Sequence, residues 1–256
     1  MNMNTNIYGA SNLQFVNNVI PSDINLVKQR IKSLLNERIS NVDGKVDSDY
    51  INDLELLYND VNEIDFNHFI DLNYPRFSLT PHEYHWLKNH PENEWIEYLV
   101  YRYRFKMYPI IKKLTKFPVH ILIETTSICN LKCTMCFQID KSFSKNKSFM
   151  GIMSWGLFTS IVDQAAEHNC RAITLGSRGE PTLHKRFGNM LHYIHQKGPF
   201  DIKINTNVTR FSEKLCHDIL SSEVATLTLS IDASTKETYE AIRKGANFDK
   251  VLKNII

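Results

Sequence analysis

Three cysteines, Cys129, Cys133 and Cys136, lie close together in this sequence, directly after an apolar run. Thiolates spaced four and three residues apart can bind three irons of a four-iron four-sulfur cluster, and they leave the fourth iron without a protein ligand. Clusters that only carry electrons usually have four cysteine ligands, whereas an open coordination position is typical of a catalytic metal site. The triplet therefore predicts chemistry at an open iron.

Two other interpretations of the triplet stay open at this point. A structural zinc ion takes four cysteine or histidine ligands, and His120 or His168 could supply the fourth. Free cysteines also serve as small buried hydrophobes. The surrounding motifs have to decide between these alternatives.

The elements that would position the cysteines alternate between strands and helices after Pro118. Strands are expected at 119–125, 172–176, 202–205 and 225–231, and helices at 154–167, 184–196 and 212–220, with a last apolar helical face at 248–255. Four successive βα units imply a parallel sheet with right-handed crossovers. In such sheets reactive groups gather at the carboxyl ends of the strands, and the cysteines follow the first strand.

The residues before this point, 1–115, predict a separate helical region without a chemical motif. Helices are expected from a cap at Ser22, over 50–64, from the capping box at Thr80, and over 92–113, after an irregular arm that ends near residue 20. The aromatic residues of this region are more typical of a core than of a ligand site. A recognition role is expected for residues 1–115, and the catalytic core is expected at 116–256.

Polar motifs follow the other three strands in turn. The second strand ends in Gly176-Ser177-Arg178-Gly179-Glu180-Pro181 and the third in Asn205-Thr206-Asn207-Val208. The fourth ends in Ser230-Ile231-Asp232-Ala233, and Ile242-Arg243-Lys244-Gly245 comes a helix later. Ser234 and Glu237 form a capping-box pattern, which favours a structural role for that pair.

Taken together, these motifs resemble the radical S-adenosylmethionine (SAM) enzymes, in particular the SPASM and twitch subgroup. The second motif is similar to the family's Gly-Gly-Glu-Pro, with Arg178 in place of one glycine, and the third is similar to Thr-Asn-Gly, with Val208 in place of glycine. The resemblance covers residues 119–256. It implies an α/β fold, a parallel partial (βα)6 TIM-like barrel of which about four βα units are present, preceded by the helical N-terminal region.

The resemblance also implies the cofactors and their ligands. A 4Fe-4S cluster would be bound by the three cysteines, with Phe137 beside it. SAM would be bound by residues that follow the second, third and fourth strands: Gly179, Glu180, Pro181, Asn205, Asn207, Ser230, Asp232 and Arg243. No catalytic side chain is assigned, because the cofactors supply the reactivity. Glu124 has two interpretations, binding of substrate or cofactor and pairing with a base such as Lys132.

The implied reaction is reductive cleavage of SAM, followed by hydrogen abstraction from a peptide or small-molecule substrate. Electrons would come from a donor such as flavodoxin or ferredoxin. Two strands of the complete core are not found, so the sequence is expected to be a fragment or a natural truncation. A catalytically inactive protein that binds the cluster or SAM is therefore the alternative, and a zinc-stabilised interaction module is a more remote one.

Composition and charge are ordinary for a globular protein. Of the 256 residues, 43% are hydrophobic and 23% charged, and the net charge of +2 indicates neither a general nucleic-acid surface nor a membrane surface. No signal-peptide pattern and no apolar run of membrane-spanning length is found. A cytoplasmic location is expected, since a reducing compartment suits thiolate ligands.

Overall fold

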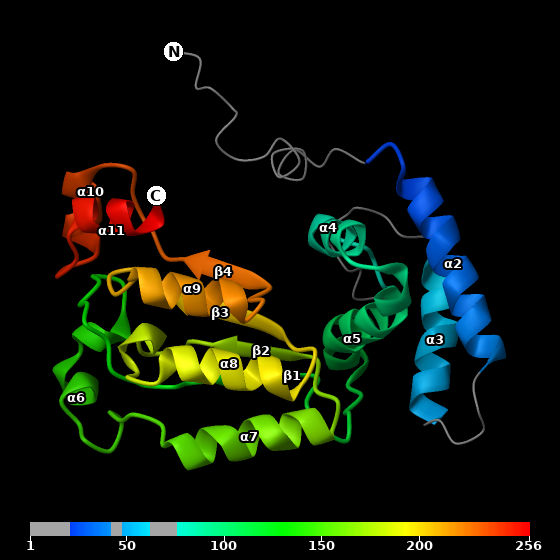
Figure 1. The fold of residues 1–256 in the computed structure, drawn as a ribbon, viewed down its shortest axis with the longest axis horizontal. Coiled ribbons are helices and arrows are strands. Elements are labelled where there is room, and N and C mark those ends of the chain that lie inside the picture. Colours follow the sequence, from blue (N-terminus) through cyan, green and yellow to red (C-terminus); the bar gives the residue numbers. More distant parts are fainter. Residues whose placement is uncertain (1–20, 42–47, 62–75) are drawn as a thin grey trace. The chain divides into compact units, whose positions relative to one another are not determined.

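The computed structural model describes residues 21–41, 48–61 and 76–256 (Figure 1). The chain divides into two compact units, Met1–Thr115 and Lys116–Ile256, which are called unit 1 and unit 2 below. The expected arm before residue 21 and the end of the expected helix over 50–64 lie outside the described residues. In the part of the chain that is described, no helix has the length and apolar character needed to cross a membrane.

Unit 1 is helical in its described parts, as its apolar periodicity predicts. The helices are α2 (Ile24–Ser40), α3 (Ser48–Asp60), α4 (Pro81–Asn89) and α5 (Glu92–Ile111). Thr80 caps α4 and forms the expected capping box with Glu83. The expected cap of α2 at Ser22 is wrong, because Asp23 occupies the cap position, and its carboxylate contacts Lys88 and Tyr84 instead of the helix backbone.

Aromatic side chains and two buried carboxylates make up much of the interior of unit 1. Trp86 and Tyr98 stack with ring centroids 3.7 Å apart. Glu83 is fully buried, and its carboxylate pairs with Arg102 and Lys106 at 2.7 and 2.6 Å. The aromatic residues are therefore core, as expected, and the buried charge is neutralised by partners on α5.

Unit 2 contains a parallel four-stranded sheet in the order β1-β2-β3-β4. The strands are β1 (His120–Ile123), β2 (Ala172–Leu175), β3 (Asp201–Thr206) and β4 (Thr226–Leu229). The connecting helices are α7 (Trp155–Glu167), α8 (Phe187–Lys197) and α9 (Glu213–Ser221), and Figure 1 shows them on one side of the sheet. The expected α/β fold with successive parallel βα units is confirmed.

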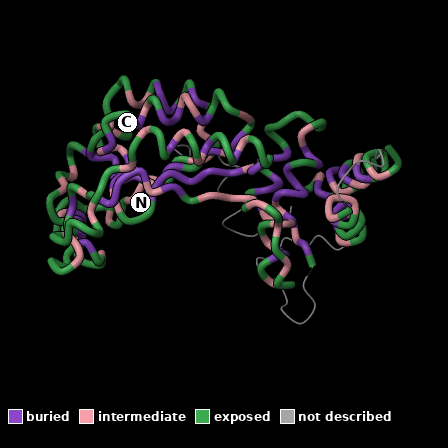
Figure 2. Tube along the Cα trace, turned by 90° about the horizontal axis from the view of Figure 1, so that it is seen from below, coloured by how far each residue is buried: buried purple, intermediate pink, exposed green. Residues whose placement is uncertain are grey.

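Side chains that alternate along each strand give the sheet one apolar face and one more polar face. Ile123, Leu175 and Ile204 are neighbours in register and pack against α7, α8 and α9 in a buried core, which Figure 2 colours purple. Side chains at intervening positions belong to the opposite face of each strand; Leu122 is 53% exposed and Lys203 is exposed. That second face belongs to the interior of the partial barrel.

Short elements surround the carboxyl edge of this sheet. They are the 3-10 turns η3 (Phe137–Ile139) and η4 (Pro181–Leu183) and the helices α6 (Lys141–Ser144), α10 (Lys236–Ile242) and α11 (Phe248–Ile255). Thr235 caps α10 by accepting from the Thr238 backbone N–H. The expected capping box of Ser234 and Glu237 is therefore wrong by one residue, since threonine at the next position makes the same bond.

Candidate active site

The three cysteines lie in one loop that leaves β1 and runs to η3. Two backbone bonds attach this loop to the end of α10 and the residues that follow it. Lys132 N–H donates to the Lys244 carbonyl and Thr134 N–H to the Ile242 carbonyl, both at 2.9 Å. Cys136 N–H donates to the Cys133 carbonyl at 2.9 Å, which closes a turn between the last two thiols. Residues more than 100 positions apart thus fix the shape of the cysteine loop.

Every sulfur of the triplet accepts at least one N–H group. The backbone N–H of Leu131 donates to Cys129 Sγ and that of Gln138 to Cys136 Sγ, both at 3.5 Å. Cys129 Sγ also lies 3.9 Å from Asn207 Nδ2, and Cys133 Sγ lies 3.9 Å from Arg243 Nη1. Donors directed at all three sulfurs fit anionic thiolate ligands, and such bonds also tune the potential of an iron–sulfur cluster.

Burial raises the pKa of the Cys129 thiol, and a smaller opposing effect comes from the Leu131 N–H. Burial likewise raises the pKa of Cys133, while the Arg243 guanidinium acts in the opposite direction. A bound metal deprotonates a coordinating thiol. Burial therefore favours the neutral thiols of Cys129 and Cys133, and coordination to iron would favour their thiolates.

The spacing of the thiols bears on whether they bind one ion or several. A zinc ion needs its ligands around a single point, and within the described ranges there is no group of three or more His, Cys, Asp or Glu residues that could hold one metal ion. A cubane cluster distributes its thiolates over different irons, so its ligands need not converge in this way.

Gly179 lies where the loop after β2 passes the loop after β1. A Cβ atom added at this position would lie 2.0 Å from the Thr126 carbonyl oxygen and 2.7 Å from that of Ile128. Glu180 N–H donates to the Ile128 carbonyl at 2.9 Å. Only glycine allows this close approach of two backbones, which is the physical reason for glycine before the glutamate.

Glu180 joins the loops after β2 and β3. Its side chain is 3% exposed, and Oε1 accepts from the hydroxyls of Thr182 at 2.6 Å and Thr206 at 2.7 Å. Oε2 accepts from the Asn207 backbone N–H at 2.7 Å. This carboxylate therefore lies between two of the predicted SAM-binding motifs and holds them together.

The segment after β3 reaches the cysteine loop through Asn207. Its Nδ2 donates to Asn130 Oδ1 at 3.1 Å and its Oδ1 accepts from the Thr209 hydroxyl at 2.6 Å. Val208, which stands where the family has glycine, adopts a φ of 63°. A β-branched residue in this region is strained, so the backbone keeps the conformation for which glycine is suited. Asn205 is the residue before the last of β3, and it lies beside Gly176.

After β4 the chain brings Asp232 and Arg243 together. Arg243 Nε lies 2.6 Å from Asp232 Oδ2, and the Arg243 side chain is almost buried, at 11% exposure, against 31% for Asp232. Ser230 N–H donates to the Thr206 carbonyl at 2.9 Å. The predicted residues of the fourth motif thus lie next to Cys133 on one side and the end of β3 on the other.

Glu124 pairs with Arg178, not with Lys132. Arg178 Nε and Nη2 lie 2.8 and 2.5 Å from the two carboxylate oxygens, and the Arg178 backbone N–H donates at 3.1 Å. Lys132 Nζ instead donates to the Gln138 carbonyl at 3.3 Å. Burial acts to raise the pKa of Glu124, but the bonds from Arg178 outweigh it and keep that pKa below its usual value.

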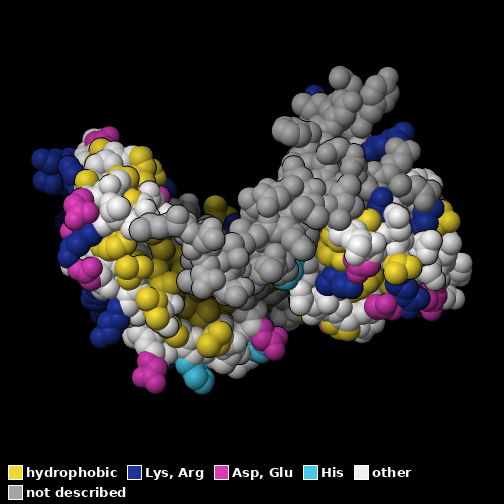
Figure 3. All heavy atoms as spheres, turned by 90° about the horizontal axis from the view of Figure 1, so that it is seen from above, with side chains coloured by type: hydrophobic (Ala, Val, Ile, Leu, Met, Phe, Trp, Pro, Cys, Tyr) yellow, Lys and Arg dark blue, Asp and Glu magenta, His cyan; other side chains and the backbone are white. Residues whose placement is uncertain are grey.

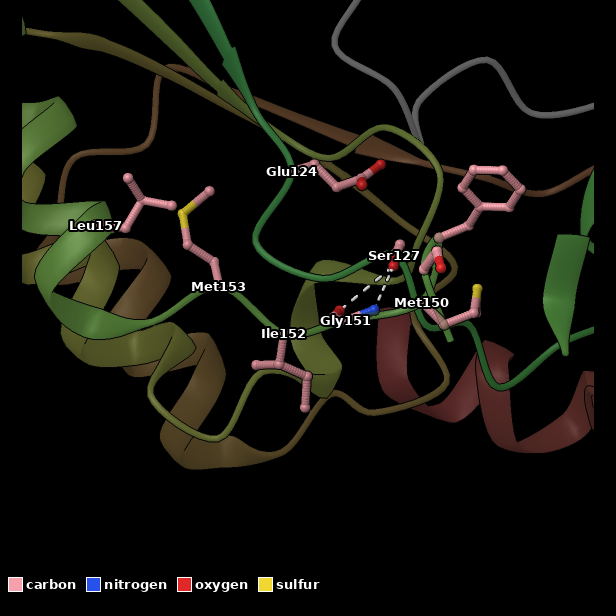
Figure 4. Close-up of a pocket in the computed structure, with 9 residues that line it drawn as sticks. Glu124, Ser127, Met150, Gly151, Ile152, Met153 and Leu157 are labelled. Carbon is pink, nitrogen blue, oxygen red and sulfur yellow. Dashed lines mark hydrogen bonds between the residues drawn. The ribbon is translucent and has the colours of Figure 1, made fainter. Parts of the chain in front are cut away.

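A pocket opens beside this ion pair (Figure 4). It is lined by Glu124, Ser127, Ser148, Phe149, Met150, Gly151, Ile152, Met153 and Leu157. The hydroxyl of Ser127 accepts from Gly151 N–H at 2.8 Å, which connects the loop after β1 to the opposite wall. This open hollow at the carboxyl edge of the parallel sheet thus combines one carboxylate and two serines with apolar side chains.

Gln138, which was not predicted from the sequence, connects three segments. Its side chain is 1% exposed, and Nε2 donates to the carbonyls of Ser127 at 2.7 Å and Arg178 at 2.9 Å. Gln138 therefore holds the cysteine loop against the loops after β1 and β2. Gln138 belongs to no recognisable sequence motif, whereas Arg178 is conspicuous in the sequence because it replaces a glycine of the Gly-Gly-Glu-Pro motif.

A parallel sheet with three thiols and polar loops at its carboxyl edge defines the core of a cofactor-dependent α/β enzyme. The radical SAM superfamily matches residues 123–256, more than half of the chain, and the chain belongs to this superfamily. The cofactors of the family are a 4Fe-4S cluster and SAM, as the resemblance of the motifs implies.

Individual relatives match the same part of the chain. The tungsten-containing aldehyde ferredoxin oxidoreductase cofactor-modifying protein of Pyrococcus furiosus is 31% identical over 139 residues, which are 52% of this chain and 37% of that protein. The cysteine-type anaerobic sulfatase-maturating enzyme of Clostridium novyi is 31% identical over 148 residues, which are 53% of this chain and 38% of that protein. The chain thus spans less than two fifths of the length of these relatives.

Among solved structures, "Native anSMEcpe with bound AdoMet and Cp18Cys peptide" is similar, with 27% identity and a TM-score of 0.44. The similarity covers 54% of this chain and 39% of that one.

Proposed function

We propose that this chain contributes the cluster-binding and SAM-binding part of an enzyme that cleaves SAM reductively and abstracts hydrogen from a peptide or protein substrate. The observation that carries the proposal is the set of N–H donors on all three cysteine sulfurs, beside Glu180 and Arg243. When bound, the cluster would supply one electron to SAM, whose cleavage to methionine would supply the 5'-deoxyadenosyl group that takes one hydrogen atom from the substrate and leaves as 5'-deoxyadenosine.

The residues after the strands have separate roles in this proposal. The carboxylate of Glu180 accepts hydrogen bonds from the SAM ammonium group. Gly179 leaves room for SAM to approach the backbone, and Pro181 shapes the loop beside Glu180. Asn205 and Asn207, at the end of β3, also bind SAM. Ser230, Asp232 and Arg243 hold the methionine carboxylate and the ribose, and Cys129, Cys133 and Cys136 bind the cluster. The loop positions of these groups at one sheet edge support the assignment.

A peptide or protein substrate is favoured by the name of one relative, the sulfatase-maturating enzyme of Clostridium novyi. The pocket beside Glu124 is proposed as the place of the substrate side chain, since Phe149 and Leu157 line it. Unit 1, with no chemical motif, is proposed as the recognition region. A one-electron protein donor such as flavodoxin or ferredoxin completes the system, in a cytoplasmic setting.

The test is anaerobic reconstitution with iron and sulfide, followed by measurement of 5'-deoxyadenosine and methionine under a chemical reductant. We expect about four irons and four sulfides per chain, and deoxyadenosine that depends on SAM. Cys133→Ala should abolish the product while the helical circular dichroism signal stays. Normal deoxyadenosine formation by this variant would refute the cluster assignment. A cluster without SAM cleavage would support the alternative of an inactive cofactor-binding protein.

A further inference from the structure

Three phenylalanines lie in a continuous row between the cysteine loop and α7. Phe137 begins η3, Phe143 belongs to α6, and Phe149 lies in the turn that follows α6. The rings of Phe137 and Phe143 meet edge to face with their centroids 4.9 Å apart, and those of Phe143 and Phe149 stack with their centroids 5.5 Å apart. We call these three residues the phenylalanine row.

Short local turns bring the three rings together. The Asp140 carboxylate caps α6 by accepting from the Ser142 N–H at 2.7 Å. After α6, the Asn146 N–H donates to the Phe143 carbonyl and the Phe149 N–H donates to the Asn146 carbonyl, both at 3.0 Å. These successive turns return Phe149 to the ring of Phe143, so local backbone bonds build the row.

The row is exposed, although its side chains are large and apolar. Unit 2, which is drawn on the left in Figure 3, carries exposed apolar side chains that gather on its surface instead of being scattered. Phe137 and Phe149 are 47% and 49% exposed, and their near neighbours Ile139 and Ile152 are 51% and 56% exposed. A contiguous apolar patch with a polar rim is typical of a surface that binds another molecule.

The row ends at the pocket beside Glu124. Phe149 lines this pocket together with Leu157, which Figure 4 shows on the opposite wall. Arg178, which pairs with Glu124, also lies over the Phe143 ring, with its Cζ atom 5.6 Å from the ring centroid. A chain segment bound along the row therefore leads directly into the pocket.

Three lysines lie beside the row without a carboxylate partner in the part of the chain that the structure describes. They are Lys141, Lys145 and Lys147, and all of them are exposed. The single acidic residue over 137–157 is Asp140. Three lysines and one aspartate give this short segment a net charge of +2, which equals that of the whole chain. Uncompensated positive charge next to apolar rings favours a ligand that is both acidic and apolar.

The ring geometry favours a peptide over a nucleic acid as this ligand. Bases of a single strand stack on free aromatic faces, but the Phe143 ring already stacks with Phe149 and lies under Arg178. A peptide side chain needs only apolar contact beside the rings, and aromatic residues are enriched in such protein contacts.

We propose that the phenylalanine row and its three lysines bind an acidic segment of the peptide substrate, with one large apolar side chain of that segment held against Phe149. This inference rests on the proposed function and narrows its substrate to peptides in which acidic residues flank a large apolar one. The rings supply the apolar contact, and the lysines supply selectivity for acidic peptides. The row then directs the bound segment toward the pocket that receives the substrate side chain.

The experiment measures the binding of short, fluorescently labelled peptides to the reconstituted chain by fluorescence anisotropy, without oxygen, at about 50 mM and about 300 mM salt. The first peptide has a central phenylalanine flanked by glutamates. The second has alanine in place of that phenylalanine, and the third has glutamines in place of the glutamates.

Two variants alter the row, and each has a matched control elsewhere in unit 2. Lys145→Glu with Lys147→Glu reverses two charges, and its control is Lys250→Glu with Lys253→Glu in α11, where both lysines are exposed. Phe149→Ser removes one end of the row. Its control is Leu220→Ser in α9, because Leu220 is also apolar and is 79% exposed.

We expect the unaltered chain to bind the first peptide about tenfold more tightly than the other two. The double lysine variant should lose about tenfold in affinity at low salt and less at high salt, where screening is stronger. Phe149→Ser should lose about fivefold at both salt concentrations, because apolar contact is not screened. With the alanine peptide, Phe149→Ser should lose nothing, since the contact that it removes is already absent.

Several results would overturn the proposal. They are equal affinity for the glutamate and glutamine peptides, equal losses in the double lysine variant and its α11 control, and equal losses of Phe149→Ser with the phenylalanine and alanine peptides. Tighter binding of poly(U) RNA through the same lysines would make the surface a nucleic-acid site. A dimer in sedimentation velocity that Phe149→Ser dissociates, without peptide binding, would make it a contact between two copies of the chain.

Failure of the proposed function has a different signature. In that case the unaltered chain forms no deoxyadenosine from SAM under a chemical reductant, while anisotropy still reports whether the acidic peptide binds along the row. A chain that forms deoxyadenosine and binds no acidic peptide would refute the docking surface alone.

Discussion

Replacing Arg243 by glutamine should make the cluster harder to reduce. Arg243 Nη1 lies 3.9 Å from Cys133 Sγ, and the side chain is nearly buried. A reduced cluster carries one more negative charge, so a neighbouring cation stabilises the reduced state. Loss of the cation should shift the midpoint potential to a more negative value.

The magnitude follows from the geometry around Arg243. Two unit charges 4 Å apart interact by about 4 kcal/mol at an effective dielectric constant of about 20. The Asp232 carboxylate, 2.6 Å from Arg243 Nε, offsets much of this. A remainder of about 1.4 kcal/mol corresponds to about 60 mV for a one-electron couple. Asp232→Asn should shift the potential in the opposite direction, because it leaves the guanidinium charge uncompensated.

The assay is a redox titration of the reconstituted chain without SAM, followed by electron paramagnetic resonance. Arg243→Lys is the matched control, since it keeps the charge, and it should shift the potential by less than half as much as Arg243→Gln. A potential of Arg243→Gln within about 15 mV of the parent value, or shifts of the same sign in Arg243→Gln and Asp232→Asn, would refute a role of the Arg243 charge in stabilising the reduced cluster.

Three further predictions concern other contacts. Gly179→Ala should abolish SAM binding measured by calorimetry, because the added Cβ would meet the Thr126 carbonyl at 2.0 Å; Gly151→Ala has nothing within 4 Å and should bind normally. Gln138→Leu should weaken SAM binding by about tenfold through loss of the two bonds from its Nε2, and unchanged affinity would argue against its positioning role. Burial acts to raise the pKa of Glu83, but its two cationic partners outweigh burial and lower that pKa below 4.5. Glu83→Gln should therefore destabilise the chain by about 3 kcal/mol at pH 7 in urea unfolding. The difference should be fully present above pH 4.5 and disappear as pH falls through the lowered pKa; a difference that persisted at lower pH would contradict this assignment.

The periodicity of apolar residues and the alternation of strands with helices were sufficient to predict a parallel sheet. They also predicted that the cysteine loop lies at the carboxyl edge of that sheet. The apolar runs at Ile123, Leu175 and Ile204 bury one face of the sheet, and local periodicity determines such elements. The helix caps were predicted less well, because Ser22 and Asp23, or Ser234 and Thr235, are chemically similar neighbours. Tertiary contacts decide which of them lies at the helix start.

The side-chain partners of the site could not be predicted in the same way. Arg178, rather than Lys132, pairs with Glu124, because the loop after β2 folds back onto the end of β1. Gln138 connects loops that are 11 and 40 residues away in sequence. Such pairings depend on how neighbouring loops pass one another, and a single sequence carries no periodic signal for that.

The most direct measurement is the electron paramagnetic resonance spectrum of the reduced, reconstituted chain, recorded with and without SAM beside the iron and sulfide content. We expect the signal of a reduced 4Fe-4S cluster whose g-values change when SAM binds the open iron. A signal that SAM leaves unchanged, or a chain that takes up zinc and no sulfide, would contradict it.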